Sequence, residues 1–243
     1  MRHRIARWRS TTLASRESQS FSQCGEDRIV LWLFRVFGIE QPRYLDVGAH
    51  HPTRQSNTFL FHRLSGSGVL VEPNPRWAAE IRRGRPRDVC IEAAAGPEPQ
   101  SGVPFYVMRS DTLSTLSKAE ADRMVRECGE EIREVREIEV VAPSGIQRRH
   151  FGAGLNFVSL DVEGVELDVL RAFDFDANRP EVFCIETLSY ATDGSGRKAV
   201  DLIAFMASVG YAVHADTYVN TIFVEEDRAR GLIAPRGARE REA

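Results

Sequence analysis

The chain has 243 residues, of which 42% are hydrophobic and 28% are charged, and its formal net charge is -3. This length fits one large domain or two small ones, and the composition is that of an ordinary soluble globular protein. A charge so close to zero creates no overall field that would attract polyanions, and we expect no nucleic acid as a partner.

Arginine-rich segments open and close the chain. We expect residues 1–19 to form a flexible basic arm and residues 226–243 to form a flexible tail. No apolar run reaches the length of about 18 residues that spans a bilayer, and the N-terminus lacks the pattern of a signal peptide. The four cysteines show neither a CxxC pair nor a metal-ligand spacing. These features predict a reduced protein of the cytoplasm.

The first half of the chain alternates strands with helices. Hydrophobic periodicity predicts a helix between Ser22 and Gly38, with Ser22 as its cap. Another helix is expected from near Ser56, and a third is expected after Asn74, which suits the N-cap, with Pro75 at the first helical position. Short apolar runs predict strands between these helices, at 44–48, 68–72 and 89–95.

The segment 100–150 is less regular than the rest of the chain, and we interpret it as an insertion on the acceptor side of a single domain over 20–225. Its runs VPFYVM and EIEVVA predict strands. Between them, Ser117 and Glu120 have the spacing of a capping box at the start of a helix.

The second half returns to alternation and ends in a hairpin. Strands are expected at 155–164 and 181–187, and helices at 165–173 and 197–209. The last two strands, 211–215 and 220–226, are joined by too few residues for a crossover helix, so they must be antiparallel. The whole pattern predicts an α/β fold whose mostly parallel sheet has helices on both faces. A dinucleotide dehydrogenase would instead end its sheet with parallel units.

The sequence RYLDVGAHHPTRQSNTF, residues 43–59, begins like a nucleotide-binding strand but lacks the second and third glycines of the dinucleotide fingerprint. Acids end the neighbouring predicted strands, where ligands bind in open parallel sheets. These acids are Asp46, Glu72, Asp161, Glu163 and Glu186. Glu72 is placed to accept hydrogen bonds from a ribose diol. A residue that binds the ribose, without the glycines that bind a pyrophosphate, favours S-adenosylmethionine as ligand. Its cationic sulfonium suits an acidic rim.

Six segments make the chain resemble the FkbM-type methyltransferase family. They are FSQCGED (21–27), LDVGAHHPTRQSNTFLF (45–61), VEPNP (71–75), TLSTLSKAEADRMV (112–125), VSLDVEGVELDVLRAF (158–173) and VNTIFV (219–224). The resemblance covers roughly residues 20–225. It implies a Rossmann-like class I methyltransferase fold with a seven-stranded sheet and an antiparallel last strand. It also implies S-adenosylmethionine as donor, and a hydroxyl of a sugar or another alcohol as acceptor.

The resemblance also implies which residues hold the cofactor. The matching positions of the cofactor-side motifs are Gly48, Ser56, Asn57, Glu72 and Asn74, and those of the N-terminal motif are Gln23 and Glu26. We add Asp46 and Asp161 from their positions at strand ends. His50 and His51 stand where many members of the family have Asn-Asp or Asn-Gly.

An alcohol is a poor nucleophile, so we expect a base or a metal ion to assist methyl transfer. Asp161 and Glu163 are two residues apart, which places them on one face of an extended strand end, and Glu186 follows the neighbouring strand. We expect Asp161 to be the base or a positioning group, with Glu163 next. Two alternatives are a divalent cation such as Mg²⁺ held by the three carboxylates, and His51 or His50 as the base.

Three further points stay open at this level. The acceptor is a small molecule or a glycan, such as a glycolipid or a glycosylated natural product. A homodimer is compatible with the sequence, which carries no signal of oligomeric state. Two other functions compete with methyl transfer, namely a module that binds the cofactor without turnover and an NAD-dependent sugar oxidoreductase. The second would need the phosphate-cradling glycines that are missing after Asp46.

Overall fold

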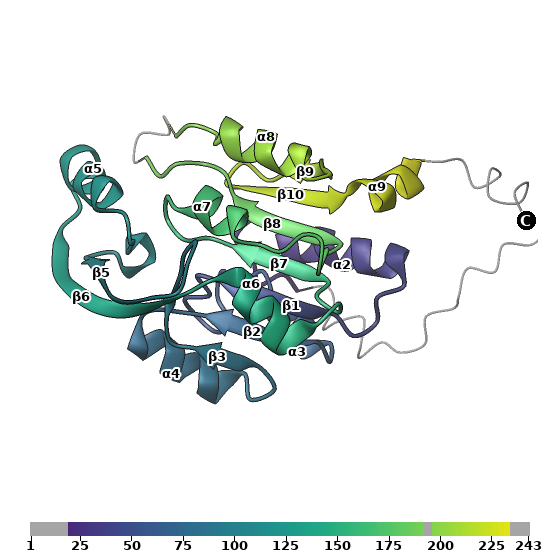
Figure 1. The fold of residues 1–243 in the computed structure, drawn as a ribbon, viewed down its shortest axis with the longest axis horizontal. Coiled ribbons are helices and arrows are strands. Elements are labelled where there is room, and N and C mark those ends of the chain that lie inside the picture. The colour runs from purple at the N-terminus through teal and green to yellow at the C-terminus, as the bar shows by residue number, and fades with distance from the viewer. Residues whose placement is uncertain (1–18, 192–195, 234–243) are drawn as a thin grey trace, which may run out of the picture.

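The computed structural model describes residues 19–191 and 196–233 of the chain (Figure 1). The basic arm expected over 1–19 therefore lies outside these ranges, except for its last residue. Residues 234–243 of the expected tail lie outside them as well. Within the described ranges, none of the helices has the length and apolar character that crossing a membrane requires.

Seven strands form the central sheet in the order β3-β2-β1-β7-β8-β10-β9. Strands β3, β2, β1, β7 and β8 are parallel, and β10 is antiparallel to both of its neighbours. The predicted mostly parallel sheet with an antiparallel last strand is confirmed. The strands are β1 (Arg43–Val47), β2 (Ser67–Val71), β3 (Val89–Ile91), β7 (Phe157–Leu160), β8 (Val182–Glu186), β9 (Tyr211–Asp216) and β10 (Asn220–Glu225).

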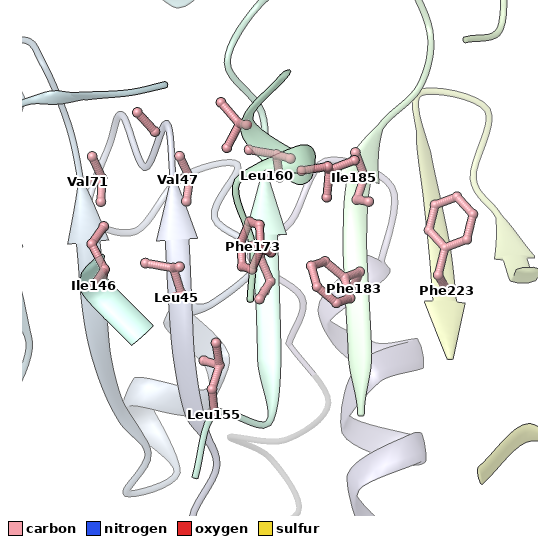
Figure 2. Close-up of a cluster of buried hydrophobic side chains, with 14 of the residues drawn as sticks. Leu45, Val47, Val71, Ile146, Leu155, Leu160, Phe173, Phe183, Ile185 and Phe223 are labelled. Atoms are coloured by element: carbon pink, nitrogen blue, oxygen red, sulfur yellow. The ribbon is translucent and has the colours of Figure 1, made fainter. Parts of the chain in front are cut away.

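Two hydrophobic cores hold helices against the two faces of this sheet. Alternate strand residues point to opposite faces, so Leu45 and Val47 enter one core while Tyr44 enters the other. Figure 2 shows the first core, in which Phe173 and Ile146 lie over the strands. Each fully buried side chain of this size contributes about 1.5–3 kcal/mol.

The helices that cover one face come from the second half of the chain, and three helices from the first half cover the other face. On the face of the first core are α6 (Pro143–Ile146), the π-helical turn η2 (Gln147–Phe151), α7 (Glu166–Arg171) and α8 (Val200–Ser208). On the face of the second core are α2 (Glu26–Phe37), α3 (Phe59–Arg63) and α4 (Pro75–Gly84).

The helix starts follow the predicted capping in part. Asn74 caps α4, because its side chain accepts a hydrogen bond from the amide of Arg76 at 3.0 Å. The cap predicted for the first helix is wrong in position: Gly25, with φ 89°, is the N-cap of α2. Ser22 still stabilises this end, since its Oγ accepts from the amide of Asp27 at 3.3 Å.

The run 89–95 does not form the single strand that its apolar character predicts. Strand β3 ends at Ile91 in the main sheet, and β4 (Ala94–Ala95) belongs to a second sheet of order β4-β6-β5. The chain leaves the main sheet at the exposed Glu92, and the two alanines are buried beside β6 (Ile132–Val141).

The insertion 100–150 supplies most of the second sheet, and projects from one end of the main sheet in Figure 1. It contains β5 (Gln100–Met108), the short helix η1 (Asp111–Leu113) and α5 (Lys118–Cys128). Only half of the predicted capping box forms. Ser117 Oγ accepts from the amide of Glu120 at 3.2 Å, but the Glu120 carboxylate binds Arg123 instead of returning to the cap.

The flexible tail predicted from residue 226 is wrong for its first part. Residues Glu226–Ile233 form helix α9, with acids in its first turn. Ala229 and Leu232 pack against the second core, which explains why this segment folds on the domain. The basic composition of this segment suggested that it is solvated, and the short apolar stripe of Ala229 and Leu232 was not recognised in the sequence.

Candidate functional site

A cavity of about 360 Å³ lies at the carboxyl ends of the parallel strands. Its wall includes a residue from the end of each of four strands: Gly48 after β1, Glu72 after β2, Asp161 after β7, and Glu186 as the last residue of β8. The second sheet and the insertion close the cavity with apolar side chains, including Phe105, Leu113 and Leu116. This is the edge at which open parallel sheets bind ligands.

Gly48 allows two strand ends to meet at the cavity. Its φ is 78°, and a Cβ atom built on it would stand 1.7 Å from the carbonyl oxygen of Asp161. No residue other than glycine fits this position without displacing the main chain. The single glycine of this loop therefore serves close approach of two backbone segments at the cavity.

Glu72 is fixed by main-chain hydrogen bonds. Its Oε2 accepts from the amide of His50 at 2.7 Å, and its Oε1 accepts from the amide of Asn74 at 2.7 Å. The residue is only 4% exposed. Burial raises the pKa of Glu72 to about 7, although the two N–H groups act in the opposite direction. Each carboxylate oxygen keeps a second lone pair for a ligand.

His50 joins the first loop to the insertion. Its Nε2 lies 3.3 Å from Oδ1 of Asp111, whose Oδ2 accepts from Nε1 of Trp77 at 2.9 Å. The rings of His50 and Trp77 have centroids 4.5 Å apart. Burial lowers the pKa of His50, although Asp111 opposes this. The backbone of His50 is in the left-handed region, with φ 48°.

Three carboxyl groups converge on the opposite side of the site. Ligand oxygens of Asp161, Glu163 and Glu186 all lie within 4.8 Å of one another. Asp161 keeps accessible surface in the cavity, yet it is surrounded by protein. Desolvation raises the pKa of Asp161, and desolvation together with the charge of Asp161 raises the pKa of both glutamates. The group therefore retains protons or attracts a cation near neutral pH.

The loop that carries Glu163 is held by side chains on both sides. Glu163 has φ 55°, and its carbonyl oxygen accepts from Oγ1 of the buried Thr115 at 2.7 Å. Oε1 of Glu166 accepts from the amides of Val162 and Gly164 at 3.2 and 3.0 Å. These contacts stabilise a backbone conformation that is unfavourable for a glutamate.

The structure brings together most, but not all, of the residues predicted from sequence. Those that line the cavity are Gln23, Gly48, His50, Glu72, Asn74, Asp161, Glu163 and Glu186. Those that do not are Glu26, Asp46, His51, Ser56 and Asn57.

Glu26 is a structural clamp in this fold. It is fully buried, and its Oε1 accepts from Oγ1 of Thr217 at 2.7 Å and from Nδ2 of Asn220 at 2.9 Å. Its Oε2 accepts from the amide of Cys24 at 2.8 Å. Although burial acts against it, these hydrogen bonds lower the pKa of Glu26. The carboxylate thus ties the start of α2 to the loop between β9 and β10.

Asp46 and Ser56 belong to a buried polar network beneath the cavity. Oγ1 of Thr58 donates to Oδ2 of Asp46 at 2.5 Å, and the buried Arg85 lies 3.9 Å from the same oxygen. Arg85 also donates to Oγ1 of Thr58 at 2.9 Å and to Oγ of Ser56 at 3.4 Å. Both predicted cofactor ligands are thus occupied by neighbours that hold the first loop on the sheet.

Asn57 and His51 are likewise engaged within the protein. Nδ2 of Asn57 donates to Oγ of Ser159 at 3.1 Å, while its Oδ1 is buried without a partner among the described residues. Nδ1 of His51 accepts from the amides of Thr53 and Arg54 at 3.1 and 3.0 Å. This bonding fits a loop-shaping role for His51 better than the role of a base at the cavity.

Sequence reasoning did not single out several residues of the wall. Asp111, Leu113 and Phe105 come from the insertion, and Tyr190 follows β8. The segment 112–125 matched a family motif, which was the available signal for the insertion. Nothing in the sequence indicated that Asp111 would contact His50.

Family models and solved structures were compared with this chain. The model of the methyltransferase FkbM domain matches residues 46–213. A TehB-like SAM-dependent methyltransferase from Corynebacterium glutamicum is 11% identical, with a TM-score of 0.42, over 88% of this chain and 92% of that one. An O-methyltransferase from Bacillus cereus, in complex with SAH, is 11% identical, with a TM-score of 0.41, over 90% and 92%. No curated protein matches the sequence significantly.

The sheet order, the antiparallel last strand and the family match together define an S-adenosylmethionine-dependent methyltransferase of the class I fold. The FkbM match covers more than half of the chain, and the chain belongs to the FkbM methyltransferase family. The family match favours methyl transfer over the two alternatives considered from the sequence, the oxidoreductase and the module without turnover.

The residues of the cavity fit this cofactor. Gly48 leaves room where a Cβ atom would fill the space between two strand ends, and Glu72 has free lone pairs for hydroxyl donors. Ala93, Ala94 and Phe105 give an apolar part of the wall that suits an adenine ring. The carboxyl cluster suits a positive sulfonium.

Proposed function

We propose that this enzyme methylates a hydroxyl group, most simply on a sugar of a glycan, a glycolipid or a glycosylated natural product. The observation that carries the proposal is the cluster of Asp161, Glu163 and Glu186, whose ligand oxygens lie within 4.8 Å of one another in the cavity wall. A hydroxyl acceptor must lose a proton as its oxygen gains the methyl group, and this cluster supplies carboxyl groups to take it.

The roles follow from position and electrostatics. Glu72 and Asn74, at the end of β2, would bind the nucleoside part of S-adenosylmethionine, which supplies an electrophilic methyl group when bound. Asp161 would accept the proton of the acceptor hydroxyl. Its raised pKa makes its carboxylate a stronger base than an aspartate with an ordinary pKa. Orientation of acceptor and donor in one cavity would lower the activation barrier, by about 7–11 kcal/mol in well-oriented systems.

The methylated product of the reaction would identify the acceptor. Extract from the host would be incubated with the enzyme and S-adenosylmethionine carrying a labelled methyl group, and the labelled product analysed by mass spectrometry. We expect the label on an oxygen of a sugar. A label on nitrogen, carbon, protein or RNA would contradict the proposal. Asp161→Asn should lose most of the turnover while binding S-adenosylhomocysteine, and unchanged turnover would remove Asp161 as the base.

The same carboxyl groups could instead hold a divalent cation such as Mg²⁺, because hard cations prefer oxygen ligands of this kind. Calorimetric titration of the metal-free enzyme with Mg²⁺ separates the two mechanisms. Binding that disappears in Glu186→Gln, with turnover abolished by a chelator, would establish the cation. Full turnover in the presence of a chelator would assign the reaction to the carboxylates alone.

A further inference from the structure

We infer that Asp111 of the insertion is a positioning residue for cofactor binding, which acts through His50 to hold Glu72 in the orientation that receives the ribose. The inference rests on the proposed role of Glu72. It gives a function to His50, in the loop after β1, and to Asp111, which lies 61 residues further along the chain. The cofactor motifs explain neither residue.

Two hydrogen bonds, one to the side chain of His50 and one from its main chain, connect the two carboxylates through this residue. Oδ1 of Asp111 lies 3.3 Å from Nε2 of His50, and the amide of His50 donates to Oε2 of Glu72 at 2.7 Å. The side chain of His50 thus faces the insertion while its main chain faces Glu72. Displacement of the ring would move the amide, since both belong to one residue.

His50 needs such support because its backbone is strained. A non-glycine residue with φ 48° is unfavourable, and it persists only where surrounding contacts fix it. Trp77 supplies a second contact, with its ring 4.5 Å from that of His50 and its Nε1 2.9 Å from Oδ2 of Asp111. Asp111 is therefore held on one side by α4 and on the other by the loop after β1.

The contact also lies in the wall of the cavity. Asp111 begins the short helix η1, and Leu113 of the same helix is a buried part of the cavity wall. About one-third of the Asp111 side chain is exposed, so this residue lies at the edge of the site and not in the core. One contact thereby couples the position of the insertion to the orientation of the ribose-binding carboxylate.

A double-mutant cycle in S-adenosylhomocysteine binding tests this coupling. Binding would be measured by calorimetry for the wild type, Asp111→Ala, Glu72→Gln and the double variant. We expect each single change to weaken binding about tenfold. We expect the double variant to bind no more weakly than Glu72→Gln, because the effect of Asp111 passes through Glu72.

Two other variants control for folding and for the type of contact. Asp122→Ala, on α5 of the same insertion, removes an exposed partner of Lys118 and should leave affinity unchanged. Asp111→Asn keeps the size of the side chain and one acceptor oxygen. It should give an intermediate loss even if Asp111→Ala folds poorly.

Wild-type affinity in both Asp111 variants, or losses that simply add in the double variant, would overturn the inference alone. Wild-type affinity in Glu72→Gln would overturn both the inference and the proposed role of Glu72. Absence of binding by the folded wild-type enzyme would overturn the proposed function with them.

Discussion

Gly48 and Asp161 are in contact through their backbones at the junction of two parallel strands. A Cβ atom on Gly48 would stand 1.7 Å from the carbonyl oxygen of Asp161 and 2.8 Å from its carbonyl carbon. Asp161 cannot easily retreat, because its amide donates to the carbonyl oxygen of Val47 at 3.0 Å. The strand end that carries the histidine loop and the one that carries the carboxyl cluster are thus fixed to each other.

Gly48→Ala should therefore lower the free energy of unfolding by more than about 2 kcal/mol, because it combines a positive φ with a backbone clash. Binding of S-adenosylhomocysteine should weaken as well. Urea unfolding measures the first effect and calorimetry the second. Gly129→Ala is the matched control, since Gly129 has φ 68° but no atom within 4 Å of a built Cβ. Equal losses in the two variants would show that the close contact has no energetic effect.

Glu26→Gln should destabilise the fold by about 1–3 kcal/mol at pH 7 and leave S-adenosylhomocysteine affinity unchanged. The reason is that Glu26 bonds Thr217 and Asn220 and does not line the cavity. Its pKa is lowered in the folded state, so its contribution is present above pH 4.5 and disappears as the pH falls through the folded-state pKa. Urea unfolding at pH 7 and at lower pH measures this difference.

Gln23→Ala gives the complementary case. Gln23 is exposed and lines the cavity, so its loss should weaken cofactor binding and change stability by less than about 0.5 kcal/mol. If Glu26→Gln also weakened binding, Glu26 would recover the cofactor-binding role that the sequence predicted for it.

The fold and part of the site were predictable from sequence for one physical reason. In a parallel sheet all strands end at the same edge, so the residues after apolar runs meet there whatever separates them along the chain. Glu72, Asp161 and Glu186 were found in this way, and all three line the cavity.

The rest depended on long-range partners that no local pattern encodes. The contact of Asp111 with His50 spans 61 residues, and that of Asn220 with Glu26 spans 194. Acids early in a helix are typical of favourable interaction with its N-terminus, and this pattern gave no indication that Glu26 is clamped by a distant hairpin. His51 bonds amides only two and three residues away and lies outside the cavity wall, although the sequence suggested it as a base.

Glu72 should make stability depend on pH. Its pKa is about 7 in the folded protein and 4.5 ordinarily, so the folded state binds the proton more tightly. The associated stabilisation is complete below pH 4.5 and is lost as the pH rises to 7. A shift from 4.5 to about 7 corresponds to about 3 kcal/mol. The free energy of unfolding of Glu72→Gln should therefore gain about this much relative to the wild type between pH 4.5 and 8.

Urea titrations of both proteins without cofactor, at several pH values, measure this difference. Asp122→Asn, which changes an exposed carboxylate, should show little pH-dependent difference from the wild type. A constant offset between Glu72→Gln and the wild type across the range would contradict the raised pKa.

Glu163→Gly should stabilise the cofactor-free protein while it impairs methyl transfer. Glycine removes the unfavourable φ of 55° and also one carboxyl group from a crowded, desolvated cluster. Burial and the charge of Asp161 raise the pKa of Glu163, so repulsion destabilises the fold more at high pH than at low pH. The gain in the free energy of unfolding should exceed about 1 kcal/mol at pH 8 and shrink at pH 5, where the cluster is more protonated.

Ser65→Gly, at an exposed position with φ 78°, relieves backbone strain without removing a charge, so its gain in the free energy of unfolding should not vary with pH. If the two variants followed the same pH course in urea unfolding, the carboxyl cluster would not carry the proposed electrostatic strain.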